Sequence, residues 1–405
     1  MEYIDGGVAA PQGFTTNGVL SGIKASRTKP DTALIFSEKA CAAAGVFTTN
    51  KVQAECVKLS RNHVSDGKAQ AIIVNSGNAN ACTGEQGAQA ARRMAQVAAS
   101  QLHLQETDVL VCSTGVIGQQ LPVEKIEAKI ADLVAGLSKE GHQAAREAIM
   151  TTDTRYKEAA VETSIGGKTV RLGTMAKGSG MIHINMGTML GFITTDCAIS
   201  PAMLAKALRE SVAGTYNCVS VDGDTSTNDT LLILANGMAG NQEITTENQD
   251  YQDFLLALNH LNTIMAKRIA ADGEGAEHLV ECQVKGAASV EDARILAKAV
   301  ISSNLVKAAF FGKDANWGRI LCAMGYSGGN FTPEKTSVSF VSKAGSIQVF
   351  QKGVPLNFDE ELARKILSED ETCIEVELQD GECSGTAWGC DLTYEYVKIN
   401  GDYRT

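Results

Sequence analysis

A glycine-rich basic segment that leads straight into an apolar stretch restricts the fold of this chain more than any other feature. The segment reads Lys177-Gly178-Ser179-Gly180-Met181-Ile182-His183-Ile184-Asn185-Met186-Gly187-Thr188, and Met189-Leu190-Gly191-Phe192-Ile193 follows it. Short apolar runs bounded by glycine are typical of a buried strand. The local pattern therefore predicts a buried strand over residues 189–194, with Thr188 at its start.

Thr188 also fits a second interpretation, as a nucleophile exposed by self-cleavage. A threonine hydroxyl is a weak nucleophile and needs a base within hydrogen-bond reach. Cleavage of the bond between Gly187 and Thr188 would free an α-amino group, whose reference pKa of about 8 suits a general base near neutral pH. Gly187 lacks a Cβ that would crowd the attacked carbonyl. From the local sequence alone, the plain strand remains the favoured interpretation.

Composition restricts the class of protein. The chain has 405 residues, of which 44% are hydrophobic, and a formal net charge of -11. This length can bury a substantial core in one large domain or two smaller ones. The negative charge argues against a nucleic-acid partner, which would call for a basic surface. Small metabolites are the better expectation.

Other absences point to a cytoplasmic protein. The sequence shows no secretory signal and no apolar run of the roughly 20 residues that a membrane span needs. The 11 cysteines are scattered and include no Cys-x-x-Cys pair, so neither a disulfide framework nor a zinc site is predicted. We therefore expect no membrane association and no metal.

Periodicity predicts a mixture of helices and strands. Apolar residues recur at helical spacing over residues 85–104, 122–137, 201–214, 250–271 and 290–305. Strand patterns cover residues 32–36, 70–75, 169–175, 189–194, 230–235, 337–341 and 372–378. Clustered strands that alternate with helices indicate layers of sheet and helix.

Several short motifs have a functional and a structural interpretation. Ser113-Thr114-Gly115 ends a predicted strand, where turn donors could stabilise an oxyanion, although a plain turn is the commoner case. The acidic run over residues 222–229 departs from the EF-hand template, so we interpret it as a polar turn without metal. Gly166-Gly167 is expected to form a hairpin turn. Lys177 and Glu274, taken singly, look like solvated surface charges.

Taken together, the motifs resemble the ornithine acetyltransferase family, also called the bifunctional glutamate N-acetyltransferases of arginine biosynthesis. The resemblance covers essentially the whole chain. It is carried by the segment around Thr188 and by these further stretches: Gly6-Gly7-Val8-Ala9-Ala10-Pro11-Gln12-Gly13-Phe14, Gly45-Val46-Phe47-Thr48-Thr49-Asn50, Val74-Asn75-Ser76-Gly77-Asn78-Ala79-Asn80-Ala81-Cys82-Thr83-Gly84, Ser113-Thr114-Gly115-Val116-Ile117-Gly118, Thr151-Thr152-Asp153-Thr154, Ser220-Val221-Asp222-Gly223-Asp224-Thr225, Asp314-Ala315-Asn316-Trp317-Gly318-Arg319 and Asn400-Gly401-Asp402-Tyr403-Arg404-Thr405.

The resemblance implies a fold and a division of the chain. The family has a layered α/β/β/α sandwich with a smaller C-terminal α/β domain. Self-cleavage between Gly187 and Thr188 would give an α chain of residues 1–187 and a β chain of residues 188–405, with the smaller domain beginning at about residue 280. Two copies of each chain would form an α2β2 heterotetramer.

The resemblance also implies the reaction and its residues. Thr188 takes acetyl from N-acetylornithine and passes it to glutamate, without a cofactor, and some members also accept acetyl from acetyl-CoA. The oxyanion hole maps onto Thr114 and Gly115. Family residues that bind the substrate map onto Thr151, Lys177, Thr188, Glu274, Asn400 and Thr405. A zwitterionic substrate needs a cation for its carboxylate and an anion for its amine, and Lys177 and Glu274 supply them.

Two departures and two alternatives stay open. The family usually reads Pro and Ala where this chain has Ile184 and Gly187, so the rate of self-cleavage could differ. One alternative is a self-cleaving aminopeptidase or amidohydrolase of the same architecture, which would pass the acyl group to water. The other is an uncleaved, non-catalytic scaffold.

Overall fold

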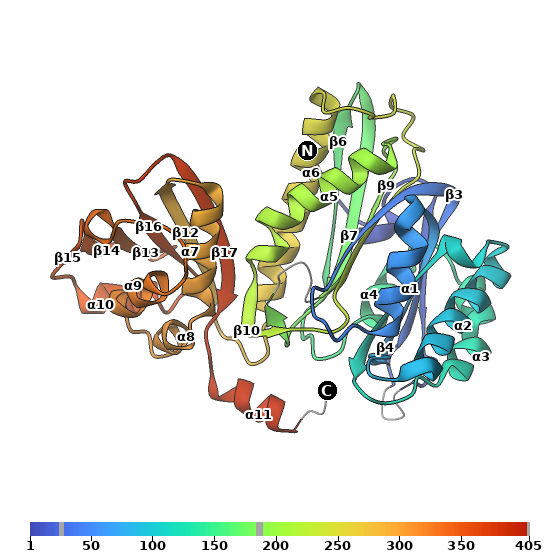
Figure 1. Cartoon of the computed structure of the whole chain (residues 1–405), viewed down its shortest axis with the longest axis horizontal. Helices are drawn as coiled ribbons and strands as arrows, with labels where there is room; N and C mark the ends of the chain where they lie inside the picture. Colours follow the sequence, from blue (N-terminus) through green and yellow to red (C-terminus); the bar gives the residue numbers. More distant parts are fainter. Residues whose placement is uncertain (24–27, 184–188, 403–405) are drawn as a thin grey trace.

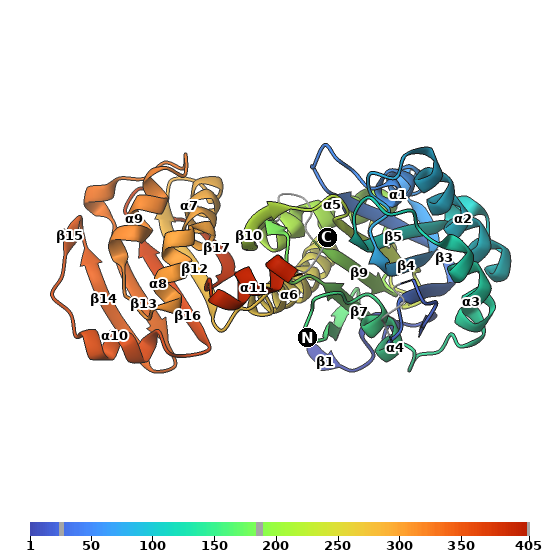
Figure 2. The ribbon, with the colours of Figure 1, turned by 90° about the horizontal axis from the view of Figure 1, so that it is seen from below.

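Two sheets of unequal size organise the molecule. The computed structural model describes residues 1–23, 28–183 and 189–402. A nine-stranded sheet lies in the first two-thirds of the chain, and a six-stranded sheet follows it. The two lie at opposite ends of the long axis, with the smaller sheet in orange and red (Figures 1 and 2).

The larger sheet has the strand order β1-β6-β7-β9-β11-β3-β4-β5, and β2 also pairs with β3. Parallel pairs join β9 to β11 and β4 to β5, and the other pairs are antiparallel. Its strands are β1 (Glu2–Ile4), β2 (Phe14–Val19), β3 (Thr32–Phe47), β4 (Lys68–Asn78), β5 (Val109–Val116), β6 (Lys157–Ile165), β7 (Lys168–Lys177), β9 (Leu190–Thr195) and β11 (Thr230–Ala235).

The long strand β3 divides this sheet into two layers. Its first half pairs with β2 and β4, its second half pairs with β11, and its register to β4 shifts between Phe36 and Cys41. Alternate residues of β9 then face different cores, because side chains on a strand alternate between faces. Ile193 packs in the core that contains α5 and α6, whereas Phe192 packs in the core that contains β4 and β5.

Helices cover both outer faces of these layers. Helices α5 and α6 lie on one side, and α1 and α2 contact β5 on the other. The predicted α/β/β/α sandwich is thereby confirmed (Figure 1). The helices of this part are α1 (Glu55–His63), α2 (Gly84–Leu102), α3 (Val123–Ala135), α4 (His142–Ala148), α5 (Pro201–Gly214) and α6 (Gln249–Ala271).

The smaller sheet has the order β15-β14-β13-β16-β12-β17 and is antiparallel except between β12 and β16. Helix α7 packs against β12 and β17. The elements of this α/β part are β12 (Leu279–Ala287), α7 (Val290–Ser302), α8 (Asn304–Phe311), α9 (Trp317–Gly325), β13 (Ser337–Ser342), β14 (Gly345–Gln351), β15 (Val354–Pro355), α10 (Glu360–Ile366), β16 (Glu371–Glu377) and β17 (Cys383–Cys390).

Local sequence signals explain where several elements begin and end. The Ser200 side chain accepts a hydrogen bond from the backbone N–H of Met203, and a proline opens the first turn, so α5 begins as predicted. The hairpin between β6 and β7 uses Gly166 and Gly167 at φ angles of 57° and 71°, a conformation that favours glycine.

One predicted helix is divided in two by the structure, and one predicted strand is much longer than expected. The helix expected over residues 290–305 ends at Ser302, because the Ser303 side chain caps a separate helix, α8. The strand expected over residues 32–36 continues to Phe47. The small residues of its second half have no strand-like periodicity, and only their pairing with β11 makes them a strand.

Two small elements lie between the sheets. Strand β8 (Ile182–His183) pairs with β10 (Ser220–Thr225), so the acidic run expected as a polar turn begins inside a strand. Helix α11 (Tyr394–Asp402) follows β17 and returns toward the larger sheet, as both views show (Figures 1 and 2).

Candidate active site

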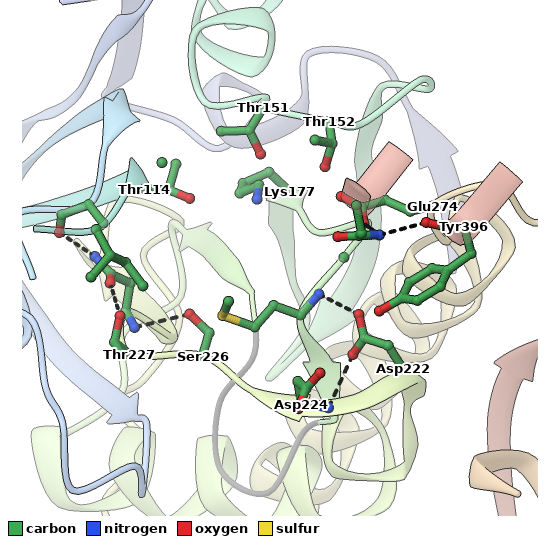
Figure 3. A pocket seen from close by; sticks show the side chains of 17 residues that line it. Thr114, Thr151, Thr152, Lys177, Asp222, Asp224, Ser226, Thr227, Glu274 and Tyr396 are labelled. Atoms are coloured by element: carbon green, nitrogen blue, oxygen red, sulfur yellow. Dashed lines mark hydrogen bonds between the residues drawn. The ribbon is translucent and has the colours of Figure 1, made fainter. Parts of the chain in front are cut away.

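One cavity collects most of the residues that the sequence singles out. It has a volume of about 330 Å³, and Figure 3 shows side chains from both parts of the fold around a common space. Six predicted site residues line it: Thr114, Gly115, Thr151, Lys177, Glu274 and Asn400. Gly187, Thr188 and Thr405 lie outside the described residues. In the described chain, β9 begins at Leu190, one residue later than predicted.

The last residues of β5 form one wall of the cavity, so Thr114 and Gly115, which were expected in a turn, lie inside a strand and pair with Ser76 and Gly77 of β4. Gly115 has a φ of 135°, and a Cβ at this position would lie 2.3 Å from the carbonyl carbon of Gly77. Only glycine fits such a close approach of two backbones. The Asn228 side chain secures this strand end by donating to the Ser113 carbonyl at 2.8 Å. Thr114 and Gly115 are therefore firmly held on the cavity wall, where they can act as donors to an oxyanion.

Lys177 supplies the positive charge at the end of β7. Its side chain is only 10% exposed, and its Nζ lies 4.0 Å from Oδ2 of Asp153. Burial alone would raise the pKa of Asp153, but Lys177, Lys157 and the backbone N–H of Gly178 lower it to about 2. Asp153 is consequently ionised at neutral pH and holds the Lys177 ammonium in place.

A second buried carboxylate joins the loop after α6 to the larger sheet. Asp272 accepts hydrogen bonds from Lys157 and Thr154, and its backbone carbonyl accepts one from the Ser179 hydroxyl at 2.6 Å. The backbone N–H of Glu274 then donates to the Ser179 carbonyl at 3.0 Å. These contacts place the Glu274 loop opposite β7.

Glycines make room for the Glu274 carboxylate and for α11. A Cβ on Gly180 would lie 2.2 Å from the Glu274 carboxylate, and a Cβ on Gly275 would lie 2.6 Å from the backbone nitrogen of Tyr396. From α11, the Asn400 amide donates to Oε2 of Glu274 at 2.8 Å. The C-terminal helix therefore reaches the cavity through Asn400.

Sequence reasoning missed an acidic cluster on the same wall. Asp222 and Asp224 on β10, together with Tyr396 on α11, line the cavity. Burial raises the pKa of Asp222, and burial followed by the nearby carboxylates of Asp222 and Glu274 raises the pKa of Tyr396. Asp222 and Asp224 are two positions apart, so interpreting this segment as a strand would have predicted that both side chains lie on the same face.

Asp222 also holds the segment that leads to the predicted nucleophile. Its carboxylate accepts hydrogen bonds from the backbone N–H groups of Met181 at 2.6 Å and Ile182 at 2.8 Å. Met181 has a φ of 56°, a conformation uncommon for a residue other than glycine. Asp222 therefore stabilises a strained turn just ahead of residues 184–188.

His183, the histidine nearest to Thr188 in sequence, does not line this cavity. Its Nδ1 lies 3.0 Å from the Ser220 hydroxyl, and its ring borders a different cavity. Burial first, and then the charge of Lys298, lower its pKa to about 4. The imidazole is thus neutral at neutral pH.

A possible metal cluster is explained without a metal. Within the described ranges, Glu277, His278 and Asp391 are the one group of side chains close enough to share an ion. His278 Nδ1 already lies 3.0 Å from Oδ2 of Asp391, whose Oδ1 accepts two backbone N–H groups. The hydrogen bond to Asp391 raises the pKa of His278, and these contacts hold the two side chains together within the described chain.

Comparison with known proteins identifies the family. The ArgJ family model matches residues 15–405. The "Arginine biosynthesis bifunctional protein ArgJ" of Symbiobacterium thermophilum is 53% identical over 406 residues, covering all of both chains. The protein of the same name from Caldanaerobacter subterraneus subsp. tengcongensis is 50% identical over 405 residues, again over the whole of both chains.

A solved structure agrees with these relatives. The crystal structure of the "Arginine biosynthesis bifunctional protein argJ" from Bacillus halodurans is 45% identical to this chain, with a TM-score of 0.51. The match covers 53% of this chain and 100% of that one. The oxyanion-type strand end, the buried cation and the opposing carboxylates thus occur in a chain whose sequence matches one family from end to end, and the chain belongs to the ArgJ family.

Proposed function

We propose that this chain transfers acetyl from N-acetylornithine to glutamate in arginine biosynthesis, through an acetyl group carried on Thr188. The observation that carries the proposal is the charge layout of the cavity. Lys177 and Glu274 line one space of about 330 Å³ beside the Thr114–Gly115 strand end. A zwitterionic amino acid needs both charges and a neighbouring oxyanion site, and relatives named for arginine biosynthesis support the assignment.

Maturation comes first in this mechanism. The Thr188 hydroxyl attacks the Gly187 carbonyl, and Thr114 and Gly115 stabilise the oxyanion. The peptide C–N bond between Gly187 and Thr188 then breaks, which leaves Gly187 as an ester on the Thr188 oxygen and frees the α-amine of Thr188. Water then hydrolyses the ester and releases the Gly187 carboxylate. The products are an α chain of residues 1–187 and a β chain of residues 188–405, whose smaller domain begins at about residue 280.

The exchange then runs as a double displacement. The Thr188 α-amine accepts the hydroxyl proton while the oxygen attacks the acetyl carbonyl of N-acetylornithine, and ornithine leaves with its α-amine restored. The α-amine of glutamate next attacks the acetyl ester, which gives N-acetylglutamate and regenerates Thr188. Lys177 holds the substrate carboxylate, Glu274 faces the cationic amine, and Thr151, Asn400 and Thr405 complete the contacts.

The proposal extends to the enzyme's setting. The exchange uses no cofactor, and acetyl-CoA is a second acetyl donor, in line with the word "bifunctional" in the relatives' names. We assign the enzyme to the cytoplasm as an α2β2 heterotetramer that binds neither nucleic acid nor membrane. Along the described stretches, every helix is too short or too polar to cross a lipid bilayer.

Intact mass spectrometry combined with an exchange assay tests the function. The wild type and Thr188→Ser should each give two chains and form N-acetylglutamate from N-acetylornithine and glutamate, because both keep a hydroxyl nucleophile. Thr188→Ala should give one full-length chain without activity. Acetate release without transfer to glutamate would favour the aminopeptidase or amidohydrolase alternative, and an uncleaved wild type would favour the scaffold.

A further inference from the structure

A second cavity borders β8, close to the segment that lines the first cavity. Its volume is about 450 Å³, and it is bordered by His183 from β8, by the turn at Asn217 and Cys218, and by one face of α7. Helix α7 packs against β10, so this cavity sits where the two parts of the molecule meet (Figure 1). Met181 lines the first cavity and His183 the second, so both cavities flank the segment that leads to residues 184–188.

The second cavity is rich in positive charge. Arg294 and Lys298, one turn apart on α7, both line it, and the exposed Glu291 is the one carboxylate among the described residues of its lining. Within the described chain, Arg294 forms no ion pair or hydrogen bond. Gly214 leaves space for its guanidinium, because a Cβ there would lie 2.8 Å from Nη2.

Two further observations indicate a site for an anion. Burial lowers the pKa of Lys298 to about 8, and a buried ammonium regains stability when an anion binds beside it. Ser302, on the same face of α7, has a buried Oγ without a hydrogen-bond partner. Buried polar atoms in native proteins usually have a partner, which can be a ligand or water.

The first cavity has the opposite character. Among the described residues that line it, the carboxylates of Asp222, Asp224 and Glu274 face the single ammonium of Lys177. Such a wall attracts an amino group but repels phosphate, because like charges at close range are unfavourable. A donor that carries phosphates therefore needs a separate place for them.

We propose that the second cavity binds the phosphate groups of a thioester acyl donor of the coenzyme A type. Arg294 presents the planar fork that matches phosphate oxygens, and Lys298 adds a point charge one turn away. The amino-acid substrate would then lie beside Met181 and the phosphates of the thioester beside His183, two residues further along the same segment. This inference rests on the second donor of the proposed function, but it concerns residues that the acetyl exchange does not use.

Calorimetric titration with coenzyme A itself tests the site, because the free thiol cannot acetylate the enzyme. The wild type should bind coenzyme A with an affinity that falls as salt rises. Arg294→Gln and Lys298→Gln should each weaken binding by about tenfold or more, since each removes a charge-assisted contact. The control is Lys343→Gln, an exposed lysine in the turn between β13 and β14, which should bind as the wild type does.

Exchange between N-acetylornithine and glutamate is measured on the same proteins. It should stay within about twofold of the wild type in both α7 variants, while the KM for acetyl-CoA rises with the weakened binding. Wild-type protein that fails to bind coenzyme A at millimolar concentration, or variants that bind it equally well, overturn the inference.

Two other outcomes also overturn it. Inorganic phosphate that binds as tightly as coenzyme A would indicate a simple phosphate site, and loss of exchange in the α7 variants would indicate that the two cavities are one functional unit. A wild type without any exchange activity refutes the proposed function itself. It does not decide the inference about the second cavity, because calorimetry measures coenzyme A binding without catalysis.

Discussion

The two walls of the amino-acid cavity are built in different ways. Thr114, Gly115 and Lys177 lie at the ends of strands in the nine-stranded sheet, where ladders on neighbouring strands hold the backbone. Glu274 and Asn400 come from the loop after α6 and from α11, which has no buried residue along its length. One wall is part of a sheet. The other, called the returning wall below, is assembled from the loop that leads into the smaller sheet and from the helix that returns from it.

The two walls therefore differ in how rigidly they hold their charged groups. A strand end within a sheet keeps a charge at a fixed place, which suits a carboxylate that ornithine and glutamate share. The loop and helix depend on a few polar contacts, such as Asp272 to Lys157 and Asn400 to Glu274. We therefore expect changes on the sheet wall to cost more than changes on the returning wall.

The largest effect should follow Lys177→Met on the sheet wall. The substrate carboxylate loses its cation, and Asp153 loses one of its two lysines, so kcat/KM for exchange should fall about 100-fold or more. Steady-state kinetics measures this loss. Lys168→Met at the exposed start of the same strand is the matched control, and equal activity in both variants would contradict the assigned role.

Asp153→Asn should lower the free energy of unfolding at pH 7 by about 2 kcal/mol, because it removes a buried carboxylate from two ammonium groups. The pKa of Asp153 is lowered from 3.8 to about 2, so its contribution is complete above pH 3.8 and disappears as the pH falls through about 2. Urea unfolding at several pH values should show the two proteins converge in acid. The exposed Asp370→Asn is the control, and a pH-independent difference would rule out this linkage.

On the returning wall, Asn400→Ala should raise the KM for N-acetylornithine by about tenfold, because one hydrogen bond to a charged group is lost. The kcat should change little, since Asn400 contacts Glu274 and not the reacting bond. If Asn400→Ala lowered kcat/KM as much as Lys177→Met does, through a fall in kcat, the expected difference between the two walls would be wrong. Lys398→Ala, an exposed residue on the same helix, serves as the control.

The smallest effect should come from the core of the smaller sheet. Ile374 is fully buried on β16, and Ile374→Val should cost about 1 kcal/mol of stability through the lost methylene. The KM values for both amino acids should remain unchanged, because β16 contributes no residue to the cavity. Urea unfolding measures the loss of stability, and kinetics on the same sample measures the KM values. An altered KM would show that this core affects the geometry of the cavity.

Local sequence was sufficient for much of the fold. Helix α5 and strand β11 begin and end at the predicted residues. Their signals, a helix cap and a buried apolar run, are carried by residues close together in the sequence. The sandwich itself was expected from the resemblance. Strand β3 was underestimated because its second half owes its conformation to a partner, β11, that lies far along the chain.

The residues of the candidate site also differ in whether the sequence could identify them. Local pattern offered Thr114 and Gly115 as oxyanion donors only beside the commoner plain turn, and the resemblance selected them. Lys177 and Glu274, taken singly, looked like surface charges, and they entered together with Asn400 only through the resemblance. Asp222 and Tyr396 escaped both, because their importance depends on burial and on charges that come from separate segments.

Sequence by itself predicted many of the strands and helices, and its ordered set of motifs indicated the family and, through the resemblance, a nucleophile at Thr188. These are properties of neighbouring residues or of the ordered set of motifs. Only the tertiary structure decided that Lys157 and Asp272, 115 positions apart, are buried together. It also decided that two cavities of different charge border the segment that contains Met181 and His183. The physical reason is that burial and electrostatic interaction depend on distance in space, and the fold alone brings these distant segments together.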